Sequence, residues 1–81
     1  VRTLAPIVLV NWTSEEGYRF SPSMIGAAGA MGVLPEAGVL DARAMDDGER
    51  YGDALARTGW AGTADPSALR RAAAYFEAHI E

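Results

Sequence analysis

The sequence contains neither cysteine nor lysine, and all seven of its basic residues are arginine. Without cysteine the chain can form neither a disulfide framework nor a thiolate zinc site, and this composition suits a cytoplasmic protein. Eleven acidic residues outweigh the arginines and give a net charge of −4. Because no basic stripe is present, we expect no binding to nucleic acid through its phosphates.

Long apolar runs and targeting signals are absent too. No run approaches the roughly 18–20 apolar residues that a membrane-spanning helix needs, so a membrane partner is not expected. The opening residues, Val1-Arg2-Thr3, include neither an initiator methionine nor the pattern of a signal peptide. With 81 residues the chain is one small domain at most. Because strand-like segments reach almost to both ends, we interpret it as an internal excerpt of a larger domain, with poor stability on its own.

Two strand-like segments enclose a helical middle region. The run from Pro6 to Thr13 is apolar without alternation, which is typical of a strand that is covered on both faces in an α/β sheet. The segment from Ala73 to Ile80 alternates between apolar and polar side chains, as a half-buried strand does. The expected fold class is therefore α/β, with two strands flanking a helical segment.

The middle region predicts three helices and a helical turn. The first helix opens at Ser21-Pro22 and ends near Gly32, and the others occupy residues 35–43, 50–58 and 67–71, with a turn at 46–48. In the helix over 50–58, Gly59 is the expected C-cap. Four of its side chains share one face at helical spacing, namely Tyr51, Ala54, Leu55 and Thr58.

Two adjacent carboxylates, Glu15 and Glu16, follow the first strand and precede Gly17. Adjacent side chains of a strand point to opposite faces, but a turn at Gly17 would let both reach one site. One carboxylate could then bind a metal ion while its neighbour moves a proton. The alternative is a solvated acidic pair beside Arg19, which the pair alone favours because exposed acidic pairs are common.

The sole histidine, His79, lies on the more polar face of the second strand. Neutral imidazole is the commonest metal ligand, although a single histidine is more often structural or simply exposed. The glycines at 26, 29 and 32 lack the order of a dinucleotide-binding fingerprint, and close helix packing explains them better. No serine has a histidine at a suitable local spacing, so serine-hydrolase chemistry is not expected.

Two segments match longer motifs. Residues 12–20 read WTSEEGYRF and are followed by Met24-Ile25-Gly26, and residues 74–81 read AYFEAHIE. They resemble F/W-T-x-E-E-G-x-R-F…M-x-G and Y-F-E-L-H-I-E-Q-G in the hydantoinase/carbamoylase family of metal-dependent amidohydrolases. That family includes N-carbamoyl-L-amino-acid hydrolases, β-ureidopropionase and allantoate amidohydrolases. The chain departs from the pattern at Ala27, where serine is usual, and at Ala78, where leucine is usual.

The resemblance implies a role for each candidate residue. Glu15 would be the catalytic general acid/base, Glu16 a ligand of one metal ion, and His79 a ligand of a second ion. The implied fold is the three-layer α/β/α catalytic domain of a zinc-peptidase-like amidohydrolase. Its two divalent ions would be zinc, with manganese or cobalt as alternatives, and the parent enzyme would be a homodimer. The family's upstream histidine and aspartate, its final histidine ligand and its lid domain have no counterpart among these 81 residues.

The activity implied by the resemblance is hydrolysis of a linear C–N bond in a small molecule, such as an N-carbamoyl amino acid, ureidopropionate or allantoate. The 81 residues alone are expected to be inactive, because they carry only part of the metal site. Two alternatives stay open. The chain could come from a related metallo-aminoacylase or peptidase with a different acyl group, or it could be a non-catalytic α/β interaction module.

Overall fold

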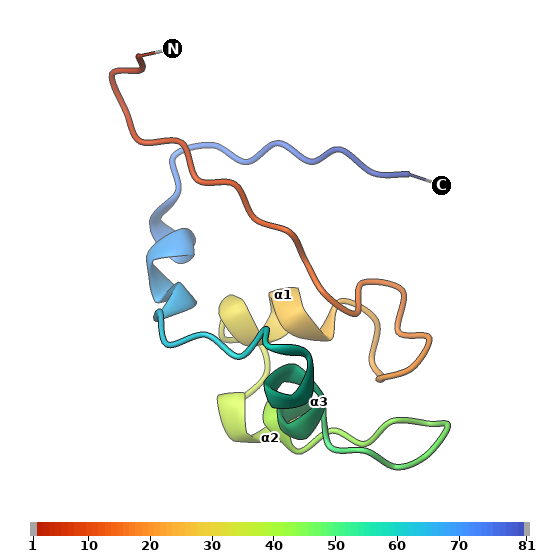
Figure 1. Ribbon diagram of the computed structural model, residues 1–81. Coiled ribbons are helices and arrows are strands. Elements are labelled where there is room, and N and C mark those ends of the chain that lie inside the picture. The colour runs from red at the N-terminus through yellow and green to blue at the C-terminus, as the bar shows by residue number, and fades with distance from the viewer. Residues whose placement is uncertain (1, 81) are drawn as a thin grey trace.

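Four short helical elements form the centre of the chain in a computed structural model, which describes residues 2–80. In chain order they are α1 (Ile25–Ala30), α2 (Glu36–Leu40), α3 (Tyr51–Thr58) and the 3-10 helix η1 (Pro66–Arg71). Long extended segments lead into and out of this helical part (Figure 1). Among residues 2–80, none of the helices has the length and apolar character that crossing a membrane requires.

Helix α3 forms where its sequence predicts. Arg50 is its extended N-cap, and Gly59 ends it in the left-handed region, at φ 79°. The N–H groups of Gly59 and Trp60 then donate to carbonyls of the last turn, as at a glycine-terminated helix. Tyr51 and Ala54 are buried on the predicted inward face, whereas Thr58 stays exposed.

The predicted start of α1 at Ser21-Pro22 is wrong. Met24 adopts φ 60° and ψ 27°, and the helix begins only at Ile25. A residue in the left-handed region cannot belong to a right-handed helix, so the first turn has to start after it. Helix α2 begins directly after Pro35, as predicted, but ends at Leu40, short of the expected Arg43.

Close packing explains two of the three glycines at 26, 29 and 32, as expected. A Cβ atom on Gly29 would lie 3.0 Å from a methyl carbon of Val39, and one on Gly26 would lie 2.9 Å from the carbonyl oxygen of Thr13. Gly29 therefore lets α1 approach α2, and Gly26 lets α1 approach the end of the first extended segment. A methyl group at Gly26 would clash with the backbone, and one at Gly29 would require the Val39 side chain to shift.

The hydrophobic core lies among the three α-helices and the segment that leads into α1. Ile25 is the most deeply buried side chain, at 1% exposure, and the rings of Phe20 and Tyr51 meet edge to face at a centroid distance of 4.9 Å. The other buried members come from α2, α3 and the loop between them, namely Val39, Ala44 and Ala54. This core fixes the position of Phe20, and thus one end of the loop that carries the two glutamates.

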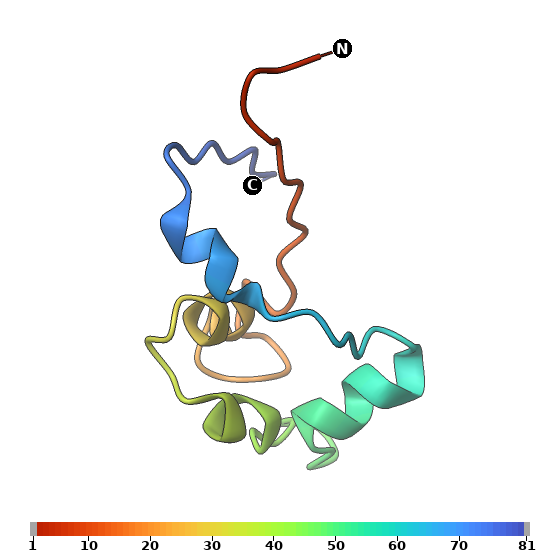
Figure 2. The same cartoon turned by 90° about the vertical axis from the view of Figure 1, so that its left-hand side faces the viewer.

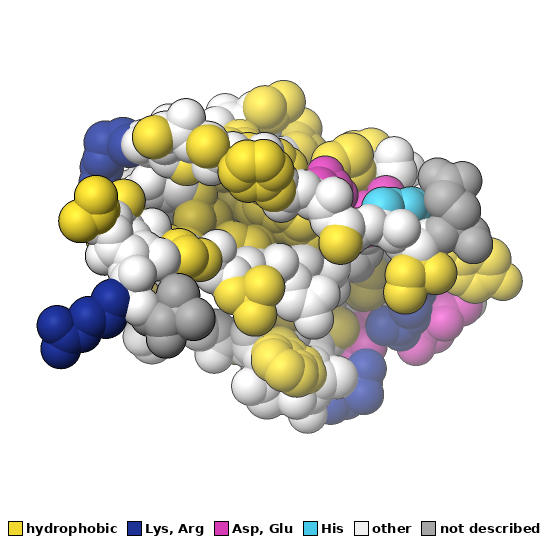
Figure 3. All heavy atoms as spheres, turned by 90° about the horizontal axis from the view of Figure 1, so that it is seen from above, with side chains coloured by type: hydrophobic (Ala, Val, Ile, Leu, Met, Phe, Trp, Pro, Cys, Tyr) yellow, Lys and Arg dark blue, Asp and Glu magenta, His cyan; other side chains and the backbone are white. Residues whose placement is uncertain are grey.

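The predicted strands are extended, but neither pairs with the other in a β-ladder within residues 2–80. Both lie on the same side of the helical part (Figures 1 and 2). Their apolar side chains are open to solvent, with Leu9 at 96% and Phe76 at 93% exposure. Viewed from that side, hydrophobic side chains surround a hollow (Figure 3). The only bridge in the described part of the chain joins Arg43 to Arg50, so the α/β fold class stays a prediction.

Candidate metal centre

The two glutamates lie on a loop, residues 14–24, which we call the carboxylate loop. The chain turns at Ser14, with φ 56°, and again at Gly17, with φ 69°. The N–H of Met24 donates to the carbonyls of Ser14 at 3.1 Å and Glu15 at 2.8 Å, which closes the loop at its base. A Cβ atom on Gly17 would come within 2.7 Å of the Ser23 nitrogen. The turn predicted at Gly17 thus needs glycine for its dihedral angle and for its close approach.

The structure brings all three predicted site residues together. One ligand atom each from Glu15, Glu16 and His79 lies within 4.8 Å of the other two. Nε2 of His79 lies 3.3 Å from Oε1 of Glu15, with the two side chains 38% and 32% exposed. Glu16 is exposed as well. The group therefore forms a shallow site at the surface, to which opposite ends of the chain contribute.

This group fits a divalent ion in its chemistry and in its closest spacing. Two ligands of a tetrahedral ion, each bound at about 2.0–2.2 Å, lie roughly 3.3–3.6 Å apart. The separation of Oε1 of Glu15 and Nε2 of His79, 3.3 Å, is compatible with that value, although the resemblance assigns metal ligation to Glu16 and His79. Carboxylate and imidazole ligands suit zinc, and also manganese or cobalt. Because three side chains supply too few ligands for two ions, the group fits as one part of a larger site.

The geometry does not separate the roles of the two glutamates. The family resemblance assigns the role of general acid/base to Glu15 and the role of metal ligand to Glu16 and His79. In the structure it is Glu15 that lies against His79, at 3.3 Å. The ligand atoms of both glutamates lie within 4.8 Å of the imidazole, so the assignment of roles stays a prediction.

His79 reaches the carboxylate loop because the two extended segments run in the same direction. Nε1 of Trp12 donates to the Tyr75 hydroxyl at 2.9 Å, and further along both segments Glu15 meets His79. The Tyr75 hydroxyl donates in turn to Glu77 at 3.2 Å. Tyr75, Glu77 and His79 thus use the polar face that the alternation predicted. The partnership with Trp12 was not predicted, because it joins residues far apart in sequence. Glu81, the last residue of the second motif, lies outside the described residues.

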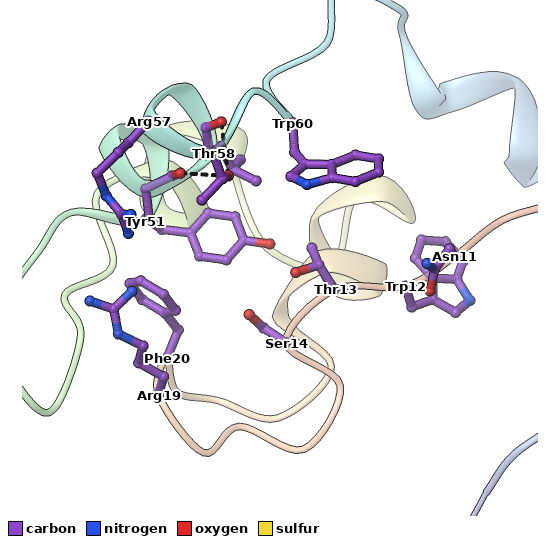
Figure 4. Close-up of a pocket in the computed structure, with 12 residues that line it drawn as sticks. Asn11, Trp12, Thr13, Ser14, Arg19, Phe20, Tyr51, Arg57, Thr58 and Trp60 are labelled. Carbon is purple, nitrogen blue, oxygen red and sulfur yellow. Dashed lines mark hydrogen bonds between the residues drawn. The ribbon is translucent and has the colours of Figure 1, made fainter.

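A hollow of about 430 Å³ opens beside the carboxylate loop. Its walls include the aromatic side chains of Trp12, Phe20, Tyr51 and Trp60, together with polar residues and two arginines. The buried Tyr51 hydroxyl has no hydrogen-bond partner within the described residues and points toward the Thr13–Ser14 side of the hollow (Figure 4). Sequence reasoning missed this hollow, since its walls come from two segments that only the fold brings together.

Arginine side chains dominate the electrostatics next to the carboxylate loop. The Arg57 guanidinium donates two hydrogen bonds to Glu49 and, with help from Arg19, lowers the pKa of that carboxyl to about 2. Hydrogen bonding to Arg19 also lowers the pKa of Asp46. These carboxylates stay ionised at neutral pH, so their hydrogen bonds to the guanidinium groups are strengthened by the opposite charges.

Comparison with known proteins tests the family resemblance. Over 84 aligned residues the sequence is 44% identical to the N-carbamoyl-L-amino-acid amidohydrolase of Rhizobium meliloti, with all of this chain and 19% of that protein aligned. The chain belongs to this amidohydrolase family. It is also 40% identical over 78 residues to a provisionally named hydrolase of Mycolicibacterium smegmatis, across 93% of this chain and 18% of that relative.

The resemblance seen in the two motifs is thereby confirmed. This amidohydrolase-family chain spans less than a fifth of either relative, at 19% and 18% of their lengths. No family model and no solved structure matched it.

Proposed function

We propose that this chain supplies part of the active site of a hydrolase that cleaves a linear amide C–N bond in N-carbamoyl amino acids or related ureido acids. The observation that carries the proposal is the meeting of Glu15, Glu16 and His79 within 4.8 Å, from opposite ends of the chain. The name of the Rhizobium meliloti relative supports the substrate class. The substrate is a small molecule, and the intact enzyme is a homodimer.

In this mechanism Glu16 and His79 would each hold one of two divalent ions, with zinc preferred. Such ions would supply polarisation of the scissile carbonyl and acidification of water. Glu15 would serve as the general acid/base that moves a proton to the leaving nitrogen. The Glu15 side chain is partly exposed, so a ligand can reach it.

The chain alone is a metal-binding segment without catalysis. Its three site residues cannot surround two ions, and the hollow beside them is open. The remaining ligands belong to other parts of an intact enzyme. Purified chain supplied with zinc should therefore not hydrolyse N-carbamoyl amino acids above the background rate.

Isothermal titration with Zn²⁺ tests the metal site directly. We expect binding by the unaltered chain and at least tenfold weaker binding, about 1.4 kcal/mol, in Glu16→Ala and His79→Ala. Glu36→Ala is the matched control, since Glu36 is an exposed acid on α2 and lies outside the group. If all four proteins bind zinc equally, the site is wrong and a non-catalytic interaction module explains the chain better.

A chimaera tests the substrate class. This chain would replace the aligned segment of the Rhizobium meliloti relative, and activity would be measured on N-carbamoyl and N-acetyl amino acids. Hydrolysis of the carbamoyl compounds, lost in Glu15→Gln, supports the proposal. A preference for the acetyl compounds would instead favour a metallo-aminoacylase.

A further inference from the structure

Arg19 connects the carboxylate loop to the turn between α2 and α3. Its Nε lies 3.1 Å from both carboxylate oxygens of Asp46, and its Nη2 donates to Asp47 at 3.1 Å and to Glu49 at 3.2 Å. The Arg19 carbonyl also accepts from the N–H of Met45 at 2.9 Å. A single loop residue is thus held through its backbone and through three carboxylates.

Glu49 is the member that carries this connection to a helix. Arg57 of α3 donates to its two oxygens at 2.8 and 2.9 Å, in a bidentate pair. The side chain of Glu49 is only 20% exposed, compared with 63% for Asp46 and 61% for Asp47. Isolated exposed ion pairs contribute little, but a less exposed carboxylate shared by two guanidinium groups is screened less and holds a defined geometry.

No helix or β-ladder holds the glutamates themselves. Within the described residues, the carboxylate loop is fixed at its base by Met24 and on its return side by Arg19 and the buried Phe20. The Arg19 guanidinium lies over the Phe20 ring, 5.1 Å from its centroid. The position of Glu15 and Glu16 therefore depends on how firmly this return side is attached.

We propose that Glu49 is a positioning residue for the metal site, which through Arg19 holds Glu15 and Glu16 where they meet His79. Glu49 does not touch the site itself and acts only through the loop. This inference rests on the proposed function for its metal readout, while its effect on the order of the loop can be measured separately.

The first test compares Glu49→Gln with Asp53→Asn. Asp53 is the matched control, because it is an exposed acid of α3 whose ion pair is with Arg50 and not with Arg19 or Arg57. We expect Glu49→Gln to raise the zinc dissociation constant about tenfold and Asp53→Asn to leave it within twofold. Arg19→Gln should weaken zinc binding as Glu49→Gln does, and Arg19→Lys should recover part of the loss because it keeps the charge.

Amide hydrogen exchange separates positioning from general destabilisation. In Glu49→Gln the amide of Met24 should exchange at least fivefold faster, while those of Ala54 and Leu55 in the first turns of α3 keep their rates. If Glu49→Gln unfolds the chain, the comparison of Arg19→Gln with Arg19→Lys decides instead. Equal exchange rates and equal zinc affinities in Glu49→Gln and Asp53→Asn would overturn the inference.

Two further outcomes are informative. If the unaltered chain binds no zinc, the proposed metal site fails, but the exchange of Met24 still decides whether Glu49 orders the loop. If all amides of the unaltered chain exchange freely, the ion pairs of Arg19, Glu49 and Arg57 do not order the carboxylate loop, and the positioning role of Glu49 is wrong.

Discussion

The helical part of the molecule and its two extended segments form a direct contrast. Ile25 and Tyr51 are 1% and 4% exposed, whereas Leu9 and Ile80 are 96% and 94% exposed. Tyr51 is the most polar of the four and is still buried, so side-chain polarity does not explain the difference. A helix satisfies its own backbone and needs only one packed face, but a strand needs a neighbour for its backbone and its side chains. Within residues 2–80 the helices pack on one another, whereas the strand-like segments form no β-ladder.

Core truncation should give the largest effect. Ile25→Ala removes a fully buried side chain and should lower the free energy of unfolding by about 2–5 kcal/mol, whereas Ile7→Ala should change it by less than about 0.5 kcal/mol. Ile7 is 79% exposed and serves as the matched control in the extended segment. Urea denaturation followed by circular dichroism measures both. Equal losses in the two variants would mean that the extended segment is packed in solution.

The turn at Gly17 should be the next most sensitive position. Gly17→Ala places a Cβ atom at φ 69° and within 2.7 Å of the Ser23 nitrogen, so we expect a loss of about 1–3 kcal/mol. A Cβ atom on Gly62 would have no neighbour within 4 Å, so Gly62→Ala should be neutral or slightly stabilising. Thermal unfolding compares the two. A tolerant Gly17→Ala would show that the carboxylate loop adopts another conformation.

Acid should weaken the attachment of the carboxylate loop. The pKa of Glu49 is lowered from 4.5 to about 2 in the folded chain, chiefly because Arg57 donates to it. A carboxyl with a depressed folded-state pKa stabilises the fold fully above its unfolded pKa, and this contribution disappears as the pH falls toward the folded value. We therefore expect the melting temperature to drop between about pH 5 and pH 2, and to drop less in Glu49→Gln.

The contact between the extended segments should give the smallest effect. Tyr75→Phe removes the hydroxyl that accepts from Trp12 and donates to Glu77. Because this contact is exposed, we expect a change in stability below about 1 kcal/mol. Zinc affinity should fall two- to threefold, since Tyr75 guides His79 toward Glu15. No change in affinity would mean that His79 reaches the loop without this contact.

Local sequence signals were sufficient to predict a helix boundary wherever a neighbouring residue sets that boundary. Pro35 immediately precedes α2 as its N-cap, and Gly59 ends α3, as predicted. Proline favours a helix start because its φ is fixed, and glycine accepts the left-handed conformation of a C-cap. The predicted start of α1 was wrong because a contact with a more distant residue sets that boundary. Met24 is left-handed because its N–H closes the carboxylate loop on Ser14 and Glu15, and no local pattern encodes that contact.

In the candidate site, too, some residues were predictable from the sequence and others were not. The motifs named Glu15, Glu16 and His79, and the alternation placed His79 on the polar face. Neither motif pointed to Glu49 or Arg57, which hold the loop, because ion pairs between distant segments leave no periodic signal. They become visible only when α3 packs beside the loop and brings Arg57 within 2.8 Å of Glu49.

By itself, the sequence determined the family and the helices with local start and stop residues, and it named the three residues of the candidate metal centre, whose roles stay a prediction. Only the tertiary structure decided that opposite ends of the chain meet at that centre, and that Arg19, Glu49 and Arg57 attach the carboxylate loop to α3. The physical reason is range. Helix capping and turns depend on neighbouring residues, whereas a metal site and a charge network depend on groups that folding alone brings within a few ångströms.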